Sequence, residues 1–463
     1  MRVRTVLTIL VFLTGIPCGS AAKERSTGKG DLQATAKRFV ELLTAGDFAT
    51  AVKDFDETMK GALPAEKLAE VWRMINAQAG PFQKQIGIRT EKEPQLEVVF
   101  VKCQFEKAAL EAKVVFDKAG KIAGLFFVPP PASQGYGIPD YVDPERFRET
   151  EVTVGAGTRA LPGTLSVPVG AGPFPGVVLV HGSGPLDRDE TVGPNKPFRD
   201  LAGGLASRGI AVLRYDKRTL VHAAEIAAML DRLTLEEETV ADALAAVRLL
   251  RASDRIDERR VFVLGHSLGG IALPRMPARD ERIAGLVMMA TPSRPLEDSI
   301  LDQMSYLFSL DGMVTEEEQA RLKEIRQQLA DMSDPALAGR SDSGKLPLGL
   351  SRAYWQDMQQ NGAPDVAAGL DRPLLILQGG RDYQVTAKDL AGWKKALDGR
   401  PNVEFRFYPK LNHLFMEGEG PGIPAEYESP GHVARAVIDD LAPWIMSRPP
   451  PAWPPRLSRR AGR

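Results

Sequence analysis

The sequence predicts two folded parts: a small α+β domain at residues 28–130, then an α/β domain at residues 140–448 with a doubly wound, mostly parallel sheet. In the larger part, apolar strand-like runs alternate with helical patterns, at 176–180, 210–215, 260–264, 285–289, 373–377 and 403–408. In the smaller part, helical patterns precede alternating strand patterns. Between the parts, Pro129, Pro130 and Pro131 open a segment with the composition of a linker.

The first 22 residues have the pattern of a secretory signal peptide: Arg2 and Arg4 form a basic start, residues 6–16 an apolar core, and residues 20–22 a small-residue cleavage site. We therefore expect an exported protein, secreted or periplasmic. Cys18 raises the alternative of a lipoprotein anchor, but the residues before it fit that pattern poorly. Cleavage leaves Cys103 as the one cysteine, so we expect no internal disulfide.

The composition is that of an ordinary globular protein. A formal net charge of −1 and 26% charged residues give no reason to expect nucleic acid or an anionic membrane as a partner. The apolar core of the leader is too short for a comfortable membrane span, so we expect no stable membrane association. The residues do not indicate an oligomeric state.

In the smaller domain, apolar residues at helical spacing indicate three helices, near 32–46, 48–55 and 68–80. Alternating patterns indicate three strands, at 96–105, 109–116 and 122–128, with a hairpin turn at 117–120. The domain is similar to small NTF2-like domains of unknown function. No residues in it have catalytic spacing, and we expect a packing or substrate-orienting module.

The larger domain opens with two strands near 151–154 and 165–169, before the parallel core. Phe198, Leu201 and Leu205 indicate a helix that stops at Gly209. Thr234 and Glu237 form a capping box for the next helix, and a final helix is expected at 432–446. Residues 449–463 are rich in Pro and Arg, and we expect them to be disordered.

About eighty residues separate the strand that ends at Ala290 from the one that begins at Pro373, far more than a crossover needs. Helical patterns at 315–332 and 348–358 indicate an inserted helical cap at about 293–370. Leu350, Tyr354 and Trp355 are candidates for lining a substrate pocket beneath it. Two alternatives remain: a decoration elsewhere on the surface, and a tryptophan that anchors the cap.

Ser267 is the candidate nucleophile. It lies within Gly265-His266-Ser267-Leu268-Gly269, directly after the apolar run 261–264 and before a helical stretch. A serine between small residues at a strand-to-helix junction is typical of a strained turn that presents Oγ at the carboxyl edge of a sheet. Pro274 and Pro277 fall in the following helix, which we expect to be short or kinked.

An acid and a base follow later strands. Asp382 comes after the run 374–380, and His413 lies five residues beyond the strand pattern 403–408. Carboxyl ends of parallel strands meet at one sheet edge, so we expect both near Ser267, with His413 as general base and Asp382 fixing its tautomer. Of the five histidines, His413 fits this role by elimination and by position.

A second glycine-rich segment follows the strand run 177–180: His181-Gly182-Ser183-Gly184-Pro185. We predict that the backbone amides of Ser183 and Leu268 form an oxyanion hole, and that His181 is structural. The charged residues 187–190 come next. They could contact substrate, but pairing with one another or with Lys217 and Arg218 is the favoured interpretation.

Residues 140–448 resemble a family of exported α/β-hydrolases close to the acyl-esterase and serine-aminopeptidase-like group. The resemblance rests on five stretches: HGSGPLDRDETVGPNKPFRDLA at 181–202, GIAVLRYDKR at 209–218, GHSLGG at 265–270, GGRDYQV at 379–385 and LNHLF at 411–415. It implies hydrolysis of a small-molecule carboxylic ester, with no metal and no organic cofactor.

Three alternatives stay open. The same three side chains serve a serine aminopeptidase or amidase, in which Asp187, Asp189 or cap carboxylates would hold the substrate amine. They also serve an acyltransferase. The alternative outside the enzymes is a non-catalytic binding protein.

Overall fold

The computed structural model describes residues 32–92, 97–106, 108–128, 136–310, 312–333 and 350–450. The expected signal peptide, the linker and residues 451–463 of the expected tail lie outside the described residues. The chain divides into two compact units, Met1–Ser133 and Gln134–Arg463. No helix in the described part is both long and apolar enough to cross a membrane.

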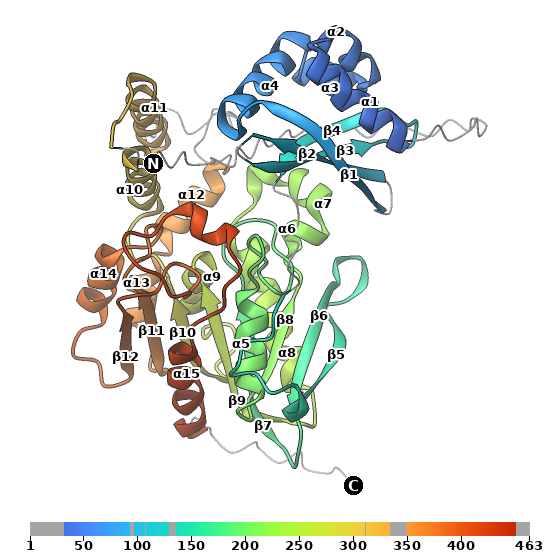
Figure 1. Cartoon of the computed structure of the whole chain (residues 1–463). Coiled ribbons are helices and arrows are strands. Elements are labelled where there is room, and N and C mark those ends of the chain that lie inside the picture. The colour runs from blue at the N-terminus through green and yellow to red at the C-terminus, as the bar shows by residue number, and fades with distance from the viewer. Residues whose placement is uncertain are drawn as a thin grey trace. The chain divides into compact units, whose positions relative to one another are not determined.

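The first unit packs helices against one face of an antiparallel sheet (Figure 1). Its elements are α1 (Leu32–Ala45), α2 (Phe48–Ala51), α3 (Glu57–Ala62), α4 (Ala65–Ala79), β1 (Phe82–Lys92), β2 (Glu97–Phe105), β3 (Ala109–Phe116) and β4 (Ile122–Val128), with strand order β1-β2-β3-β4. Cys103 is free and buried in this unit, and burial raises the pKa of its thiol to about 12.

The structure corrects the expected layout of the first unit at two places. The sheet has a fourth strand, β1, which pairs antiparallel with β2. Its sequence, FQKQIGIRTEK, is mostly polar because it is an edge strand with little buried surface, so its apolar alternation is weak. The expected helix at 48–55 ends early: α2 passes into a 3-10 turn at Val52–Asp54, and Asp56 then caps a separate helix, α3.

The second unit has an eight-stranded sheet of order β12-β11-β10-β9-β7-β8-β6-β5, parallel from β12 to β8, with β6 and β5 antiparallel at one edge. The strands are β5 (Phe147–Val154), β6 (Leu161–Pro168), β7 (Phe174–Val180), β8 (Ala211–Tyr215), β9 (Ile256–His266), β10 (Ile283–Met289), β11 (Leu374–Gly379) and β12 (Val403–Tyr408). The predicted doubly wound, mostly parallel sheet is confirmed.

Alternate residues of the central strands enter two cores. Val178 and Val180 of β7 pack with α8 (Ala241–Arg251) on one face, whereas Val177 and Leu179 pack with α5 (Pro197–Ala206) and α15 (Arg435–Ser447) on the other (Figure 1). Helices cover both faces, which is why these strands are near-continuous apolar runs. The remaining helices outside the cap are α6 (Arg218–Val221), α7 (Ala223–Ala227), α9 (Leu268–Ala272) and α14 (Ala387–Leu397).

The interval between β10 and β11 is helical. It contains α10 (Leu296–Ser309), α11 (Glu316–Ser333), α12 (Arg352–Gln360) and α13 (Ala363–Ala368), and α10 and α11 form a helical hairpin (Figure 1). Residues 334–349 of the expected cap lie outside the described residues. Helix α10 was not expected from the sequence. Trp355 of α12 packs with Ile300, Ile325 and Leu329, so the cap has a small core of its own.

Candidate active site

Ser267 lies in a strained turn between β9 and α9. Its φ of 52° and ψ of −119° are in a region that side-chain-bearing residues seldom adopt. The flanking glycines make the turn possible: a Cβ on Gly265 would lie 2.5 Å from the Gly269 carbonyl carbon, and one on Gly269 would lie 2.2 Å from the Val180 carbonyl oxygen. The helix that follows is short, ending in a 3-10 turn at Leu273–Arg275, as the prolines predicted.

Asp382 and His413 meet on the loops that follow β11 and β12, two neighbouring parallel strands. His413 Nδ1 lies 2.7 Å from Asp382 Oδ2, and both residues are buried. The other carboxylate oxygen, Oδ1, accepts the backbone N–H of Gln384 at 2.8 Å and of Val385 at 2.9 Å. Because a carboxylate only accepts, Nδ1 carries the proton and Nε2 is left as the base.

The predicted oxyanion segment lies beside Ser267. A Cβ on Gly182 would be 3.3 Å from the Ser267 Cβ, which puts the loop after β7 against the elbow. Ser183 is exposed and follows that glycine, and Leu268 is the first residue of α9. Both residues therefore adjoin the Ser267 turn along the chain or through Gly182, and the role of their backbone amides as oxyanion donors stays a prediction.

A buried charged pair behind this site was not predicted. Glu190 Oε1 accepts the Gly182 N–H at 2.7 Å, and Oε2 lies 3.1 Å from His266 Nδ1. The other ring nitrogen, His266 Nε2, lies 2.9 Å from the carbonyl oxygen of His413. Glu190 and His266 thus connect the loop after β7 to the loop of the candidate base. The pair could not be identified from the sequence, because Glu190 is one of four consecutive charged residues at 187–190.

The electrostatics of this pair favour an ion pair. Burial is the largest single influence on the pKa of His266 and would lower it, but Glu190, the His413 carbonyl and the Asp382 charge together raise that pKa above its usual value. Burial is also the largest single influence on the pKa of Glu190 and would raise it, but His266, His181 and the Gly182 N–H together lower that pKa. Each group holds the other in its charged form.

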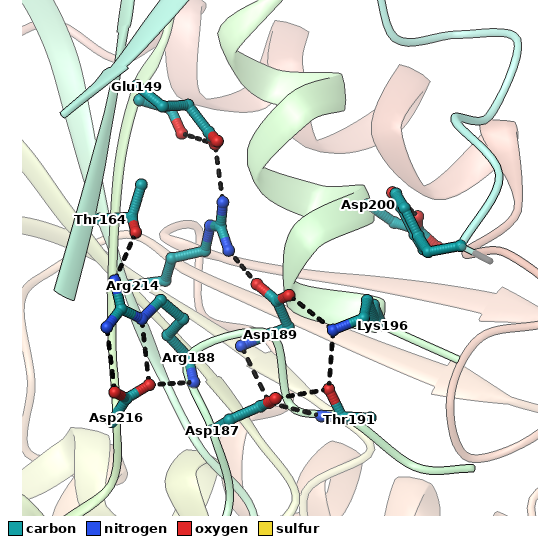
Figure 2. A network of polar contacts seen from close by, with 12 residues as sticks. Glu149, Thr164, Asp187, Arg188, Asp189, Thr191, Lys196, Asp200, Arg214 and Asp216 are labelled. Carbon is teal, nitrogen blue, oxygen red and sulfur yellow. Dashed lines mark hydrogen bonds and ion pairs between the residues drawn. The ribbon is translucent and has the colours of Figure 1, made fainter. Parts of the chain in front are cut away.

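The charges that follow the oxyanion segment form a network with other elements (Figure 2). Asp187 accepts the backbone N–H of Thr191 and its hydroxyl; Arg188 pairs with Asp216 at 3.0 Å. Asp189 pairs with Lys196 at 2.9 Å and with Arg214. The charges of residues 187–190 have partners, as expected, but these are not Lys217 or Arg218. These two residues pair with Glu238 and Asp242 instead.

His181 has a structural environment, as predicted. It is buried, and its Nε2 lies 3.1 Å from the carbonyl oxygen of Asp187. Burial lowers the pKa of His181 to about 4, so the ring is neutral.

The three cap candidates lie in packed surroundings. Tyr354 is buried in the main core with its hydroxyl 2.6 Å from Glu238 Oε2, and Trp355 is buried in the cap core. Leu350 packs against both cores. Within the described part of the chain, Trp355 thus packs inside the cap and does not anchor the cap to the sheet, and the pocket-lining role of the three residues stays a prediction.

The unexpected helix α10 reaches the loop of the candidate acid. A cavity of about 350 Å³ is lined by Tyr306 of α10 together with Asp382, Tyr383 and Gly422. The rings of Tyr306 and Tyr383 stack with centroids 5.5 Å apart, and the Tyr306 hydroxyl donates to the Gly422 carbonyl at 2.8 Å. Among the described residues, no three His, Cys, Asp or Glu side chains are grouped as metal ligands would be.

Comparison with known proteins gives two family matches. Residues 177–460 match the model described as the alpha/beta hydrolase family, and residues 36–125 match a family of proteins of unknown function, DUF3887. The second match falls in the first unit, where a small domain of unknown function was expected.

A curated relative is similar over most of its length. Esterase EstD of Thermotoga maritima is 40% identical over 408 residues, which are 88% of this chain and 94% of that protein. Two solved structures align with TM-scores of 0.40 and 0.42 at 16% identity: Est1E from Butyrivibrio proteoclasticus, covering 64% of this chain and 98% of that one, and a puromycin-hydrolyzing peptidase of Mycobacterium tuberculosis, covering 80% and 48%. With the family model matching more than half of its residues, the chain belongs to the α/β-hydrolase family.

Proposed function

We propose that the protein hydrolyses carboxylic esters through an acyl-enzyme on Ser267, with His413 as general base and Asp382 as its orienting acid. The observation that carries the proposal is the 2.7 Å contact between Asp382 and His413 on loops at the same sheet edge as the strained Ser267 turn. The 40% identity to a protein named as an esterase supports the ester as substrate class.

In this mechanism Ser267 Oγ attacks the ester carbonyl carbon while His413 Nε2 takes the hydroxyl proton. The carbonyl oxygen becomes an oxyanion, which accepts the N–H groups of Ser183 and Leu268. Collapse of this intermediate breaks the C–O bond, and His413 returns the proton to the leaving alcohol. A water molecule then attacks the acyl group with the same proton transfers, releasing the acid. Asp382 stabilises the imidazolium in both steps.

Two of the candidate amine-binding groups of the aminopeptidase alternative are already engaged. Asp189 is paired with Arg214 and Lys196, and Asp187 is occupied by backbone and hydroxyl donors of its own loop. Neither carboxylate is left to receive a substrate ammonium, which leaves the cap carboxylates as the remaining candidates for that role, and the similarity to a protein named as an esterase favours the ester over the amide. Acyl transfer and a non-catalytic binding role have no observation in their favour.

The test is a panel of short p-nitrophenyl esters, a matched aminoacyl ester and a matched amide, run on the full chain. We expect ester turnover that Ser267→Ala abolishes at an unchanged melting temperature, with the exposed Ser447→Ala as the matched control. Added alcohol acceptors would reveal acyl transfer as a second product. A wild-type protein that turns over the amide faster than the ester would replace the esterase proposal with an amidase.

We also propose that the protein is exported, on the basis of the leader-like pattern of residues 1–22. Expression of the full chain in a bacterial host, followed by fractionation and N-terminal sequencing, tests this proposal. Protein that stays in the cytoplasm with residues 1–22 intact would contradict it.

A further inference from the structure

A buried lysine contacts the loop after β7 at the carbonyl of Gly182, the residue whose N–H is bonded to Glu190. Lys217 follows β8, and its Nζ donates to the carbonyl oxygen of Gly182 at 2.8 Å. The same ammonium lies 2.6 Å from Glu238 Oε1, and only 3% of the lysine side chain and 8% of the glutamate side chain are exposed. Separating the pair would leave an uncompensated charge in the interior, which is costly. We therefore expect the lysine and the glutamate to stay together in one geometry.

Glu238 is itself held from two sides. It lies in a π-helical turn at Glu236–Val240, a rare geometry that is frequent at functional sites. Its second oxygen, Oε2, accepts the Tyr354 hydroxyl at 2.6 Å. Burial and the charge of Glu238 raise the pKa of Tyr354 well above its usual range, so that hydroxyl keeps its proton and donates. Hydrogen bonds therefore run from α12 of the cap through Glu238 and Lys217 to Gly182.

The contact at Gly182 has a consequence for the next residue. The Gly182 carbonyl and the Ser183 N–H belong to one planar peptide unit, in which the two groups of a trans bond point in opposite directions. Fixing the direction of the carbonyl therefore fixes the direction of the N–H. A charge-assisted bond to the oxygen also polarises the peptide, which makes its N–H a stronger donor.

The segment that carries Lys217 is attached to the same loop at two more points. The Lys217 backbone N–H donates to the Leu186 carbonyl at 3.0 Å, and the Thr219 hydroxyl donates to the Gly184 carbonyl at 3.0 Å. The loop and the lysine segment are thus positioned as one body.

We propose that Lys217, held by Glu238 and Tyr354, is a positioning residue that aims the Ser183 N–H at the oxyanion. This inference rests on the proposed function, because it needs a reaction in which an oxyanion forms. It predicts that loss of the lysine contact weakens binding of the transition state while binding of the ground-state ester is kept.

The chain offers a matched control one residue along. Arg218 forms a similarly buried pair with Asp242, with Nε donating to Oδ2 at 2.9 Å. No contact of that pair reaches residues 182–184 in the described part of the chain. The control therefore removes a neighbouring buried ion pair without touching the loop after β7.

The experiment compares two double variants, Lys217→Met with Glu238→Gln and Arg218→Met with Asp242→Asn. Changing both partners leaves no unpaired buried charge in either protein. We expect the Lys217 pair variant to lose at least about tenfold in kcat, since a lost oxyanion donor typically costs 10²–10³. Its KM should stay within about twofold, because the ground-state carbonyl makes little use of the donor. The Arg218 pair variant should keep kcat within about threefold at a similar loss of thermal stability.

Two further arms make the result decisive. Lys217→Arg keeps a cationic donor and should recover most of the kcat that the Lys217 pair variant loses. If the Lys217 pair variant does not fold, Tyr354→Phe and Glu238→Gln decide instead, each with an expected drop of about three- to tenfold in kcat at constant KM. Three results would overturn the inference. The two pair variants could lose kcat equally, or the Lys217 pair variant could raise KM and leave kcat unchanged. Tyr354→Phe and Glu238→Gln could also both keep the wild-type kcat. A Ser267→Ala rate equal to wild type would show instead that the proposed function has failed.

Discussion

Replacing Glu190 by Gln tests whether the buried pair with His266 is ionic. The surroundings favour a charged imidazole: His266 Nε2 donates to the His413 carbonyl, and the Glu190 carboxylate lies 3.1 Å from Nδ1, where a second proton on the ring makes the contact an ion pair. A glutamine removes this preference. Its amide oxygen can still accept the Gly182 N–H, and its amide nitrogen can donate to an unprotonated Nδ1. The variant therefore suits neutral His266, and the wild type suits His266 as a cation.

The pKa directions set the pH at which the difference appears. Because the pKa of His266 is raised above its usual 6.5, its stabilisation is fully present below that value and is lost as the pH rises through the raised pKa. Because the pKa of Glu190 is lowered below its usual 4.5, its stabilisation is present above that value and is lost as the pH falls through the lowered pKa. The pair therefore stabilises the fold most between pH 4.5 and pH 6.5, the usual pKa values of the two groups.

The magnitude follows from the burial of both partners. Removing one partner of a buried pair costs about 3–5 kcal/mol. His266 recovers part of this cost by releasing its proton, and the release itself costs about 1.4 kcal/mol for each unit by which the pH lies below the pKa of His266. We expect Glu190→Gln to lower the free energy of unfolding by about 2–4 kcal/mol at pH 6 and by a smaller amount at pH 9.

The assay is urea unfolding of the full chain at both pH values, following the transition of the α/β unit. Asp280→Asn is the control, because its partner Arg251 stays charged across this range. Its destabilisation should be the same at pH 6 and at pH 9. A Glu190→Gln cost that is constant between the two pH values, or that grows toward pH 9, would refute the ion-pair reasoning.

Three further outcomes are expected. Gly269→Ala should reduce ester turnover more than about 100-fold, because its Cβ would lie 2.2 Å from the Val180 carbonyl oxygen, whereas Gly61→Ala, whose Cβ meets nothing, should match the wild type. Asp382→Asn should lower kcat by about 10³–10⁴ with little change in melting temperature, because the amide no longer fixes the protonated Nδ1 of His413. Trp355→Ala should cost about 3–5 kcal/mol in a thermal or urea melt, since the ring fills the cap core; a changed acyl-chain preference at unchanged stability would favour a pocket role instead.

The sheet and the positions of Ser267, Asp382 and His413 could be predicted because they depend on local patterns. A parallel strand covered on both faces is an apolar run, and its carboxyl end fixes the sheet edge to which the next residue belongs. The Thr234 capping box was readable in part: Glu237 Oε2 accepts the Thr234 backbone N–H at 3.0 Å, but the Thr234 hydroxyl accepts the N–H of Glu236 at 3.3 Å and not that of Glu237. The π-helical turn that begins at Glu236 was not, because nothing in the local pattern distinguishes it from an α-helical start.

The buried charges could not be predicted, because a paired interior charge and a solvated one look alike in a sequence. Glu190 pairs with His266, which lies at the end of another strand. Lys217 pairs with Glu238, which lies in a helical turn whose register cannot be deduced from its residues. Strand β1 was missed because its residues are mostly polar and lack a clear apolar alternation, and helix α10 because its apolar residues are mostly half-buried. Tertiary contacts determine each of these features.

The most direct test of a nucleophilic Ser267 is to trap it covalently and locate the adduct. The full chain is treated with a fluorophosphonate, and its peptides are analysed by mass spectrometry. We expect one adduct, on the peptide that contains Ser267, which is absent in Ser267→Ala and formed far more slowly in His413→Ala. An adduct on another serine, such as Ser183, or a folded wild-type protein that hydrolyses esters without any labelling, would contradict this expectation.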